Sequence, residues 1–171
     1  EVKKRTGCLV HVDAVQSVGK FKEWNQLSSE LDSYTFSSHR FGGMKSSGFS
    51  FLKSGLDFKP LVNGGGQQKS YRSGTENPLY IKCIQLALED LIENTDIEKT
   101  FRIRKEIENI LLKQENIEVV ALDLPRANNT IGFIYKKEKS DVTQAQFDMN
   151  GVAIGRGAAC SSGSLTKSRT L

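Results

Sequence analysis

Residues 8–20 of the chain are Cys-Leu-Val-His-Val-Asp-Ala-Val-Gln-Ser-Val-Gly-Lys, and this stretch indicates the class of fold. Four of its first five residues are apolar and polar or basic residues precede them, which predicts a short buried strand over residues 8–12. Asp13 follows at the carboxyl end of that strand. Because open α/β sheets bind ligands beyond the carboxyl ends of their strands, Asp13 and the nearby Gln16 are candidate site residues.

Two more strands and a helix are predicted next along the chain. Residues 33–37 alternate polar with aromatic or β-branched side chains, and residues 48–53 form another short run beside a loop rich in Ser and Gly. A helix is predicted from Thr75, which would cap it, with Pro78 in its first turn. Apolar residues then recur at spacings of three and four, which predicts one helical stripe of Leu79, Cys83, Leu86, Ala87 and Leu91.

The remaining sequence predicts a second, smaller part of the fold. The polar residues 94–96 separate the first helix from another over residues 96–114, whose apolar face would hold Ile97, Phe101, Ile107, Ile110 and Leu111. Strands are predicted over residues 117–121, 130–135 and 152–154, and a helix near residues 142–150. Strands interleaved with helices predict an α/β protein in two parts, residues 1–95 and residues 96–171.

The composition of the 171 residues excludes several classes of function. With 37% hydrophobic and 26% charged residues the chain is typical of a soluble globular protein. No apolar stretch approaches the roughly 20 residues that cross a membrane. A net charge of +4 without basic blocks argues against a nucleic-acid partner. The three cysteines are widely spaced, which predicts neither a disulfide framework nor a metal site and favours the reducing cytoplasm.

Polar residues suited to a charged ligand follow the strand predicted over residues 33–37. Ser37-Ser38-His39-Arg40 offers hydroxyl, imidazole and backbone donors in one loop, which suit a phosphate. An Asp at the end of a neighbouring strand can act as the counter-ion of a protonated heterocycle, as in pyridoxal-phosphate enzymes. Two simpler interpretations stay open, in which Asp13 is a turn or capping residue and His39 is a structural histidine.

Two further loops are candidates for function. Residues 64–68, Gly-Gly-Gly-Gln-Gln, precede the segment from Arg72 to Thr75 at a predicted helix start, which suits an anion, although a plain flexible loop is the alternative. Residues 155–164, Gly-Arg-Gly-Ala-Ala-Cys-Ser-Ser-Gly-Ser, surround Cys160 with small side chains, and Arg156 favours its thiolate. Cys160 is therefore predicted to be a nucleophile, whereas Cys8 and Cys83 are predicted to be buried and inert.

Taken in order, four segments resemble motifs of the cysteine desulfurases, pyridoxal-phosphate enzymes of the class V aminotransferase group. Residues 11–20 resemble H-x-D-x-x-Q-x-x-G-K, and residues 37–45 resemble S-x-H-K-x-x-G-P-K-G. Residues 64–77 resemble G-G-G-Q-E-x-x-x-R-S-G-T-E-N, and residues 157–164 resemble G-S-A-C-x-S-G-S. The resemblance implies a type I pyridoxal-phosphate-dependent transferase fold, with the large cofactor-binding domain ending near residue 95 and the small domain following.

The same resemblance implies how pyridoxal phosphate would be held. Asp13 would pair with the pyridinium nitrogen and Gln16 would contact the phenolic oxygen. Ser37 and His39 would hold the phosphate. Thr75 would reach the phosphate in the partner subunit of a homodimer.

For the reaction, the resemblance implies that Cys160 attacks the sulfur of bound L-cysteine and leaves L-alanine and a persulfide. A sulfur-acceptor protein would then receive the sulfur, for iron-sulfur cluster assembly or tRNA thiolation. No direct contact with nucleic acid or a membrane is expected. The N-terminal part of the family and its C-terminal end are not matched, so we expect the chain to be a fragment of a longer polypeptide.

Arg40 departs from the resembled pattern, because it stands at the position of the Schiff-base lysine. A guanidinium stays charged at a pKa above about 12 and does not condense with an aldehyde. Lys45, five residues on, would have to rearrange its loop to replace that amine. The alternatives are therefore a catalytically inactive homologue that acts as a sulfur-relay or scaffold partner, or a related class V aminotransferase or selenocysteine lyase.

Overall fold

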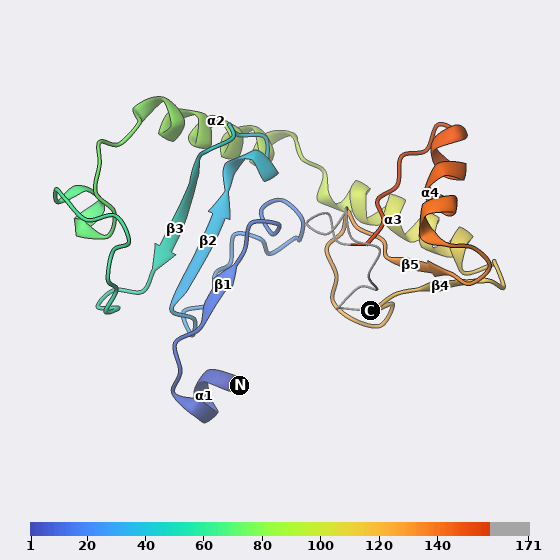
Figure 1. Ribbon diagram of the computed structural model, residues 1–171, viewed down its shortest axis with the longest axis horizontal. Helices are drawn as coiled ribbons and strands as arrows, with labels where there is room; N and C mark the ends of the chain where they lie inside the picture. The colour runs from blue at the N-terminus through green and yellow to red at the C-terminus, as the bar shows by residue number, and fades with distance from the viewer. Residues whose placement is uncertain (158–171) are drawn as a thin grey trace. The chain divides into compact units, whose positions relative to one another are not determined.

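The computed structural model describes residues 1–157, which form two compact units (Figure 1). The first unit comprises Glu1–Phe101 with Ala127–Asn129, and the second comprises Arg102–Arg126 with the residues from Thr130 onward. No helix within residues 1–157 is long and apolar enough to cross a membrane. The helices and strands, in chain order, are α1 (Val2–Thr6), β1 (His11–Asp13), β2 (Ser33–Ser37), β3 (Gly48–Leu52), α2 (Pro78–Asn94), α3 (Ile97–Leu111), β4 (Ile117–Val119), β5 (Phe133–Tyr135) and α4 (Ser140–Met149), with short 3₁₀ helices at Ser38–Arg40 and Gln67–Ser70.

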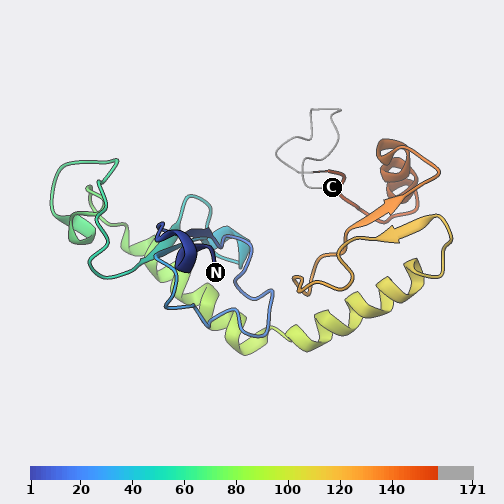
Figure 2. The same ribbon diagram turned by 90° about the horizontal axis from the view of Figure 1, so that it is seen from below.

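The first unit is built on a three-stranded sheet in the order β1-β2-β3. β2 pairs parallel with β1 and antiparallel with β3. The alternation that predicts β2 also gives the sheet one aromatic face, because Phe36 lies opposite Phe49 and their rings stack 4.8 Å apart. Figure 2 shows α2 along this sheet, and the buried core between them consists of Ala14, Val18, Phe36, Phe41, Ala87 and Leu91.

The start of α2 differs from the prediction, because its N-cap is Asn77 and not Thr75. The Asn77 side chain accepts hydrogen bonds from the backbone N–H groups of Leu79 and Tyr80. Pro78 occupies the first helical position, where its missing N–H costs nothing, so the residue directly before it is the one placed to cap. The predicted stripe is only partly buried, since Leu79 and Leu86 are exposed.

The strand predicted over residues 8–12 is shorter and less buried than expected. β1 begins at His11, and both Cys8 and Leu9 are exposed. β1 is an edge strand of the described sheet, so residues 8–10 have a neighbour on one side only, where the Val10 carbonyl accepts from the Asp32 N–H. An apolar run therefore does not show that a second layer covers it, and burial depends on such a layer.

The second unit pairs β4 with β5 in an antiparallel ladder. Val119 is buried and lies opposite Phe133, whose ring contacts Phe147 of α4 at 6.3 Å between centroids. The strand predicted over residues 152–154 does not form. Instead, the Gln144 side-chain amide of α4 donates a hydrogen bond to the Ile154 carbonyl at 2.9 Å. The backbone carbonyl of Ile154 is thus bonded to a helix side chain.

The predicted apolar face of α3 is only partly correct, since Ile97, Phe101 and Leu111 are half-buried on the inner side of the helix. Ile107 and Ile110 are exposed, whereas Arg104 is buried and Glu108 is only 1% exposed. Glu108 forms ion pairs with Arg104 at 3.6 Å, with Lys105 at 3.3 Å and with Arg126 at 2.9 Å. We call these four residues the Glu108 cluster. A buried carboxylate requires such partners, and here they come partly from a residue beyond β4.

Candidate functional site

The parallel pairing of β1 and β2 brings two predicted site residues to the same edge of the first sheet. Asp13 ends β1 and Ser37 ends β2, and the carboxyl ends of parallel strands meet at one edge. Asp13 lies opposite Thr35, and the Ala14 N–H donates to the Thr35 carbonyl at 2.9 Å, which carries the ladder one residue further. Asp13 and Ser37, both predicted from the sequence as site residues, therefore lie at the same edge of the sheet.

Asp13 is exposed at this edge. One of its carboxylate oxygens accepts a hydrogen bond from the Val15 N–H at 3.1 Å, which is the turn interaction that an Asp at a strand end typically makes. No other hydrogen bond or ion pair of this carboxylate is present within residues 1–157. Gln16, on the same turn, is exposed as well. The turn geometry thus leaves the carboxylate open to solvent and to a ligand.

Ser37 and His39 form a hydrogen-bonded pair directly after β2. The Ser37 hydroxyl and the His39 Nδ1 atom are 2.9 Å apart. Ser37 is half-buried and His39 is exposed, so the pair lies at the surface of the sheet edge. A hydroxyl and an imidazole held together in this way suit an anionic oxygen ligand.

Ser38, between them, fastens the loop that follows. It is fully buried, and its hydroxyl lies 2.5 Å from the Met44 carbonyl and 3.0 Å from the Ser47 carbonyl. Its backbone N–H donates to the Ser47 carbonyl, and its own carbonyl accepts from the N–H groups of Phe41 and Gly43. These hydrogen bonds hold the two ends of the loop over residues 38–47 together around the buried Ser38 side chain.

Replacing Ser38 by alanine is expected to destabilise the first unit. The change removes a fully buried hydroxyl and its hydrogen bonds to the carbonyl oxygens of Met44 and Ser47, which costs about 1–3 kcal/mol. Urea unfolding monitored by circular dichroism measures the loss, with the exposed Ser50 changed to alanine as the matched control. Equal midpoints for the two variants would contradict the fastening role of Ser38.

Arg40 occupies the exposed side of this loop. Its guanidinium has no hydrogen bond or ion pair with any residue of the described part of the chain. Lys45 is also exposed, but it lies in the segment that Ser38 fastens. The structure thus gives Arg40 no internal structural partner.

Thr75 lies in a separate loop of the first unit. In this loop the buried Ser73 donates to the Gly65 carbonyl at 2.9 Å, and Gln67 accepts from the Gly74 N–H at 3.3 Å. Thr75 itself is exposed, and no hydrogen bond joins it to Asp13, Ser37 or His39 among the described residues. Its implied role at the phosphate of a partner subunit requires a second chain.

The predicted nucleophile, Cys160, lies outside the described residues, and the prediction for the other two cysteines is wrong. Cys8 is exposed and Cys83 is half-buried, where burial was expected for both. Cys8 stands before the start of β1, where no second layer covers the chain, and Cys83 lies toward the partly open side of α2. Burial therefore does not make Cys8 inert.

This exposure predicts an order of alkylation. Cys8 is expected to react with iodoacetamide faster than Cys83 in the folded protein, because reagent reaches an exposed thiol more readily. Peptide mapping of partially alkylated protein measures both rates, and unfolded protein in denaturant gives the reference. Faster labelling of Cys83 would contradict the described burial of the two thiols.

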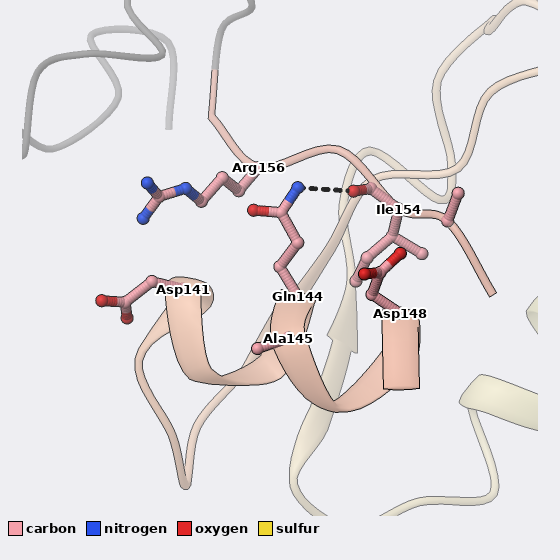
Figure 3. Close-up of a pocket in the computed structure, with 7 residues that line it drawn as sticks. Asp141, Gln144, Ala145, Asp148, Ile154 and Arg156 are labelled. Carbon is pink, nitrogen blue, oxygen red and sulfur yellow. Dashed lines mark hydrogen bonds between the residues drawn. The ribbon is translucent and has the colours of Figure 1, made fainter. Parts of the chain in front are cut away.

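A cavity in the second unit was not found from the sequence. Its volume is about 430 Å³, and Figure 3 shows that Arg156 and Asp141 lie on the same side of α4. Its lining comes from α4, from the segment predicted as a strand and from Arg156 just after that segment, namely Asp141, Gln144, Ala145, Asp148, Ala153, Ile154 and Arg156. The only indication of this cavity in the sequence was the pair of acidic residues Asp141 and Asp148, which lie seven positions apart on α4.

The residues at the edge of the first sheet fit a pyridine phosphate in part. The open Asp13 carboxylate suits a pyridinium nitrogen, and the Ser37–His39 pair suits a phosphate. Arg40 does not fit covalent attachment, because a guanidinium is not the primary amine that condenses with an aldehyde. The donor set thus fits non-covalent holding of the group and does not fit a covalent link at residue 40.

Comparison with known proteins gives consistent matches along the chain. Residues 1–170 match the family described as Aminotransferase class-V. The chain is 32% identical to a cysteine desulfurase of Sinorhizobium fredii, aligning all of its length with 45% of that protein. It is 36% identical to a cysteine desulfurase of Nostoc sp., where 98% of this chain aligns with 42% of the relative. The chain therefore spans less than half the length of these curated relatives.

A solved structure gives the same result for the fold. The structure of a NifS-like protein from Rickettsia africae matches 92% of this chain and 44% of its own, with a TM-score of 0.76 and 28% identity. A second NifS-like protein matches with a TM-score of 0.71, also at 28% identity. The expected α/β fold, that of the type I pyridoxal-phosphate-dependent transferases, is confirmed. With a family match that extends over residues 1–170, the chain belongs to the class-V aminotransferases.

Proposed function

We propose that this chain forms part of a cysteine desulfurase-type protein that uses pyridoxal phosphate. The observation that carries the proposal is the meeting of Asp13 and the Ser37–His39 pair at one sheet edge in a class-V aminotransferase fold. The curated relatives that bear the name cysteine desulfurase support the same reaction. The substrate would be L-cysteine and the product L-alanine.

Each site residue has a defined task in this proposal. When bound, pyridoxal phosphate supplies an electron sink for the bonds at the substrate α-carbon. Asp13 holds the pyridinium proton with its carboxylate, and Gln16 donates its amide N–H to the phenolic oxygen. Ser37 and His39 hold the phosphate. Thr75 serves the phosphate of the partner in a homodimer.

Cys160 is the proposed sulfur carrier. Its thiolate attacks the sulfur of L-cysteine, so that an S–S bond forms, the substrate C–S bond breaks, and carbon takes up a proton to leave L-alanine. The resulting persulfide passes its sulfur to an acceptor protein. A reducing cytoplasm keeps the three cysteines available as thiols.

A second candidate function follows from Arg40. A homologue that binds the cofactor without a covalent link would not turn over L-cysteine and would act as a sulfur-relay or scaffold partner. The open guanidinium of Arg40, which has no internal partner among the described residues, favours this candidate.

An assay with labelled L-cysteine separates the two candidates. The polypeptide that contains this chain is incubated with L-cysteine and pyridoxal phosphate, and L-alanine and the Cys160 persulfide are measured by mass spectrometry. Alanine and persulfide in equal amounts support the desulfurase, and their loss in Cys160→Ser confirms the carrier. If neither product forms but Cys160 takes up sulfur from a separate donor persulfide, the result supports the relay. Neither product and no uptake contradict both.

A further inference from the structure

The backbone turn after β2 projects Arg40 outward together with His39. Ser38 and Phe41 are both buried, and they are three residues apart in a 3₁₀ turn. A 3₁₀ helix repeats every three residues, so positions 38 and 41 share the inner side and positions 39 and 40 lie away from it. His39 and Arg40 are accordingly exposed. The guanidinium thus leaves the same turn as the imidazole that pairs with Ser37.

Two opposite charges at this sheet edge have no ionic partner among the described residues. No ion pair joins the Asp13 carboxylate to Arg40, and within residues 1–157 neither has another ionic partner. The chain does pair charges elsewhere, as in Lys3 with Asp32 and in the Glu108 cluster. Asp13 and Arg40 therefore both remain available to a ligand that carries a cationic and an anionic group.

A phosphorylated pyridine has this pair of charges. Its ring nitrogen is cationic when protonated, and its phosphate carries up to two negative charges. A guanidinium binds phosphate with two parallel hydrogen bonds and stays charged at every physiological pH. It forms no covalent bond with an aldehyde, so the aldehyde of such a ligand adds nothing to binding.

We propose that Arg40 binds the phosphate of phosphorylated pyridines, and that the site selects phosphate and ring charge rather than the aldehyde. Pyridoxal phosphate and pyridoxamine phosphate then bind reversibly and with the same affinity. This inference rests on the proposed function for its class of ligand. It goes beyond that function in making Arg40 a ligand-binding residue and in assigning the site a different selectivity from that of a lysine-containing site.

Equilibrium dialysis with the native polypeptide that contains this chain tests the selectivity. Dissociation constants for pyridoxal phosphate and pyridoxamine phosphate are expected to agree within about threefold, because the shared groups supply the binding. Pyridoxal, which lacks the phosphate, is expected to bind at least about tenfold more weakly, as loss of a charge-assisted hydrogen bond predicts. Borohydride treatment of the pyridoxal phosphate complex should leave no covalent label.

Two variants test the role of Arg40 itself. Arg40→Gln should weaken both phosphorylated ligands by about tenfold, because the guanidinium charge is lost. Lys45→Gln removes the same charge from an exposed position of the same loop and should change neither affinity by more than about twofold, since an exposed charge at a distance is screened by salt. Because Arg40 is exposed and has no internal partner among the described residues, its removal should leave the unfolding transition unchanged.

The outcomes separate this inference from the proposed function. Pyridoxal phosphate binding more than tenfold tighter than pyridoxamine phosphate, or equal weakening by Arg40→Gln and Lys45→Gln, overturns the inference. Binding of pyridoxal phosphate by Arg40→Lys but of neither ligand by the native chain overturns the inference and leaves the cofactor assignment standing. Failure of both proteins to bind either ligand overturns the cofactor assignment together with the inference.

Discussion

Arg40→Lys is expected to change the covalent retention of pyridoxal phosphate from none to as much as one cofactor per chain. A lysine at residue 40 supplies the primary amine that a guanidinium cannot provide, on the turn that already carries Ser37 and His39. The measurement is borohydride reduction followed by peptide mapping of the segment around residue 40. In the polypeptide that contains this chain, the same change is expected to raise L-alanine formation.

The native protein and a second lysine provide the controls for this prediction. Lys45 should carry no cofactor before or after the substitution, because the buried Ser38 holds its loop through the carbonyls of Met44 and Ser47. Lys45→Gln in the Arg40→Lys background should therefore leave the label in place. Cofactor on Lys45 of the native protein would show that this loop rearranges and that the structural argument is wrong.

The second large effect is expected from Glu108→Gln, which should destabilise the second unit by about 3–5 kcal/mol. The substitution keeps the shape of the side chain but leaves Arg104 and Arg126 beside a neutral group in a buried position. Urea unfolding followed by fluorescence or circular dichroism gives the difference. The matched control is Glu118→Gln, which removes the same charge from an exposed pair with Lys136 and should cost less than about 1 kcal/mol.

The pH dependence of unfolding provides an independent measure of the same cluster. Burial raises the pKa of Glu108, but the neighbouring Lys105, Arg126 and Arg104 outweigh it and hold the pKa below its ordinary value. Glu108 thus stabilises the folded state above the ordinary glutamate pKa of about 4.3, and this contribution is lost as the pH falls through the lower folded value. Glu108→Gln should remove that part of the acid sensitivity. An unchanged pH profile would contradict the ionised state of Glu108.

The elements that the sequence predicts well are those whose signals are local. β2 matches its predicted bounds because alternation over five residues suits a strand with one aromatic face. α2 ends at Asn94, the first residue of the predicted boundary over residues 94–96, although its start at Pro78 is three residues later than predicted. The shared location of Asp13 and Ser37 also follows from sequence, since each directly follows or ends a strand of one parallel pair.

The features that the sequence does not reveal depend on distant partners. The burial of Glu108 on α3 depends on Arg126, which lies 18 positions further along the chain and beyond β4, so periodicity within the helix does not predict it. The exposure of Cys8 depends on which layers cover residues 8–10, and composition carries no record of that. Ser38 resembles any loop serine until its burial and its contacts with the loop carbonyls are seen.

The mixed pairing of the first sheet has a consequence for the order in which this unit folds. The bond between Ser38 and Ser47 closes a span of nine residues, whereas the bond between His11 and Ser33 closes a span of 22. Closing a loop twice as long costs about 0.6 kcal/mol more in chain entropy, and short-range contacts form faster. We therefore expect β2 and β3 to associate first and β1 to join them later. Asp13 then reaches the Ser37–His39 pair late in folding, so ligand binding reports the completed sheet rather than its hairpin nucleus.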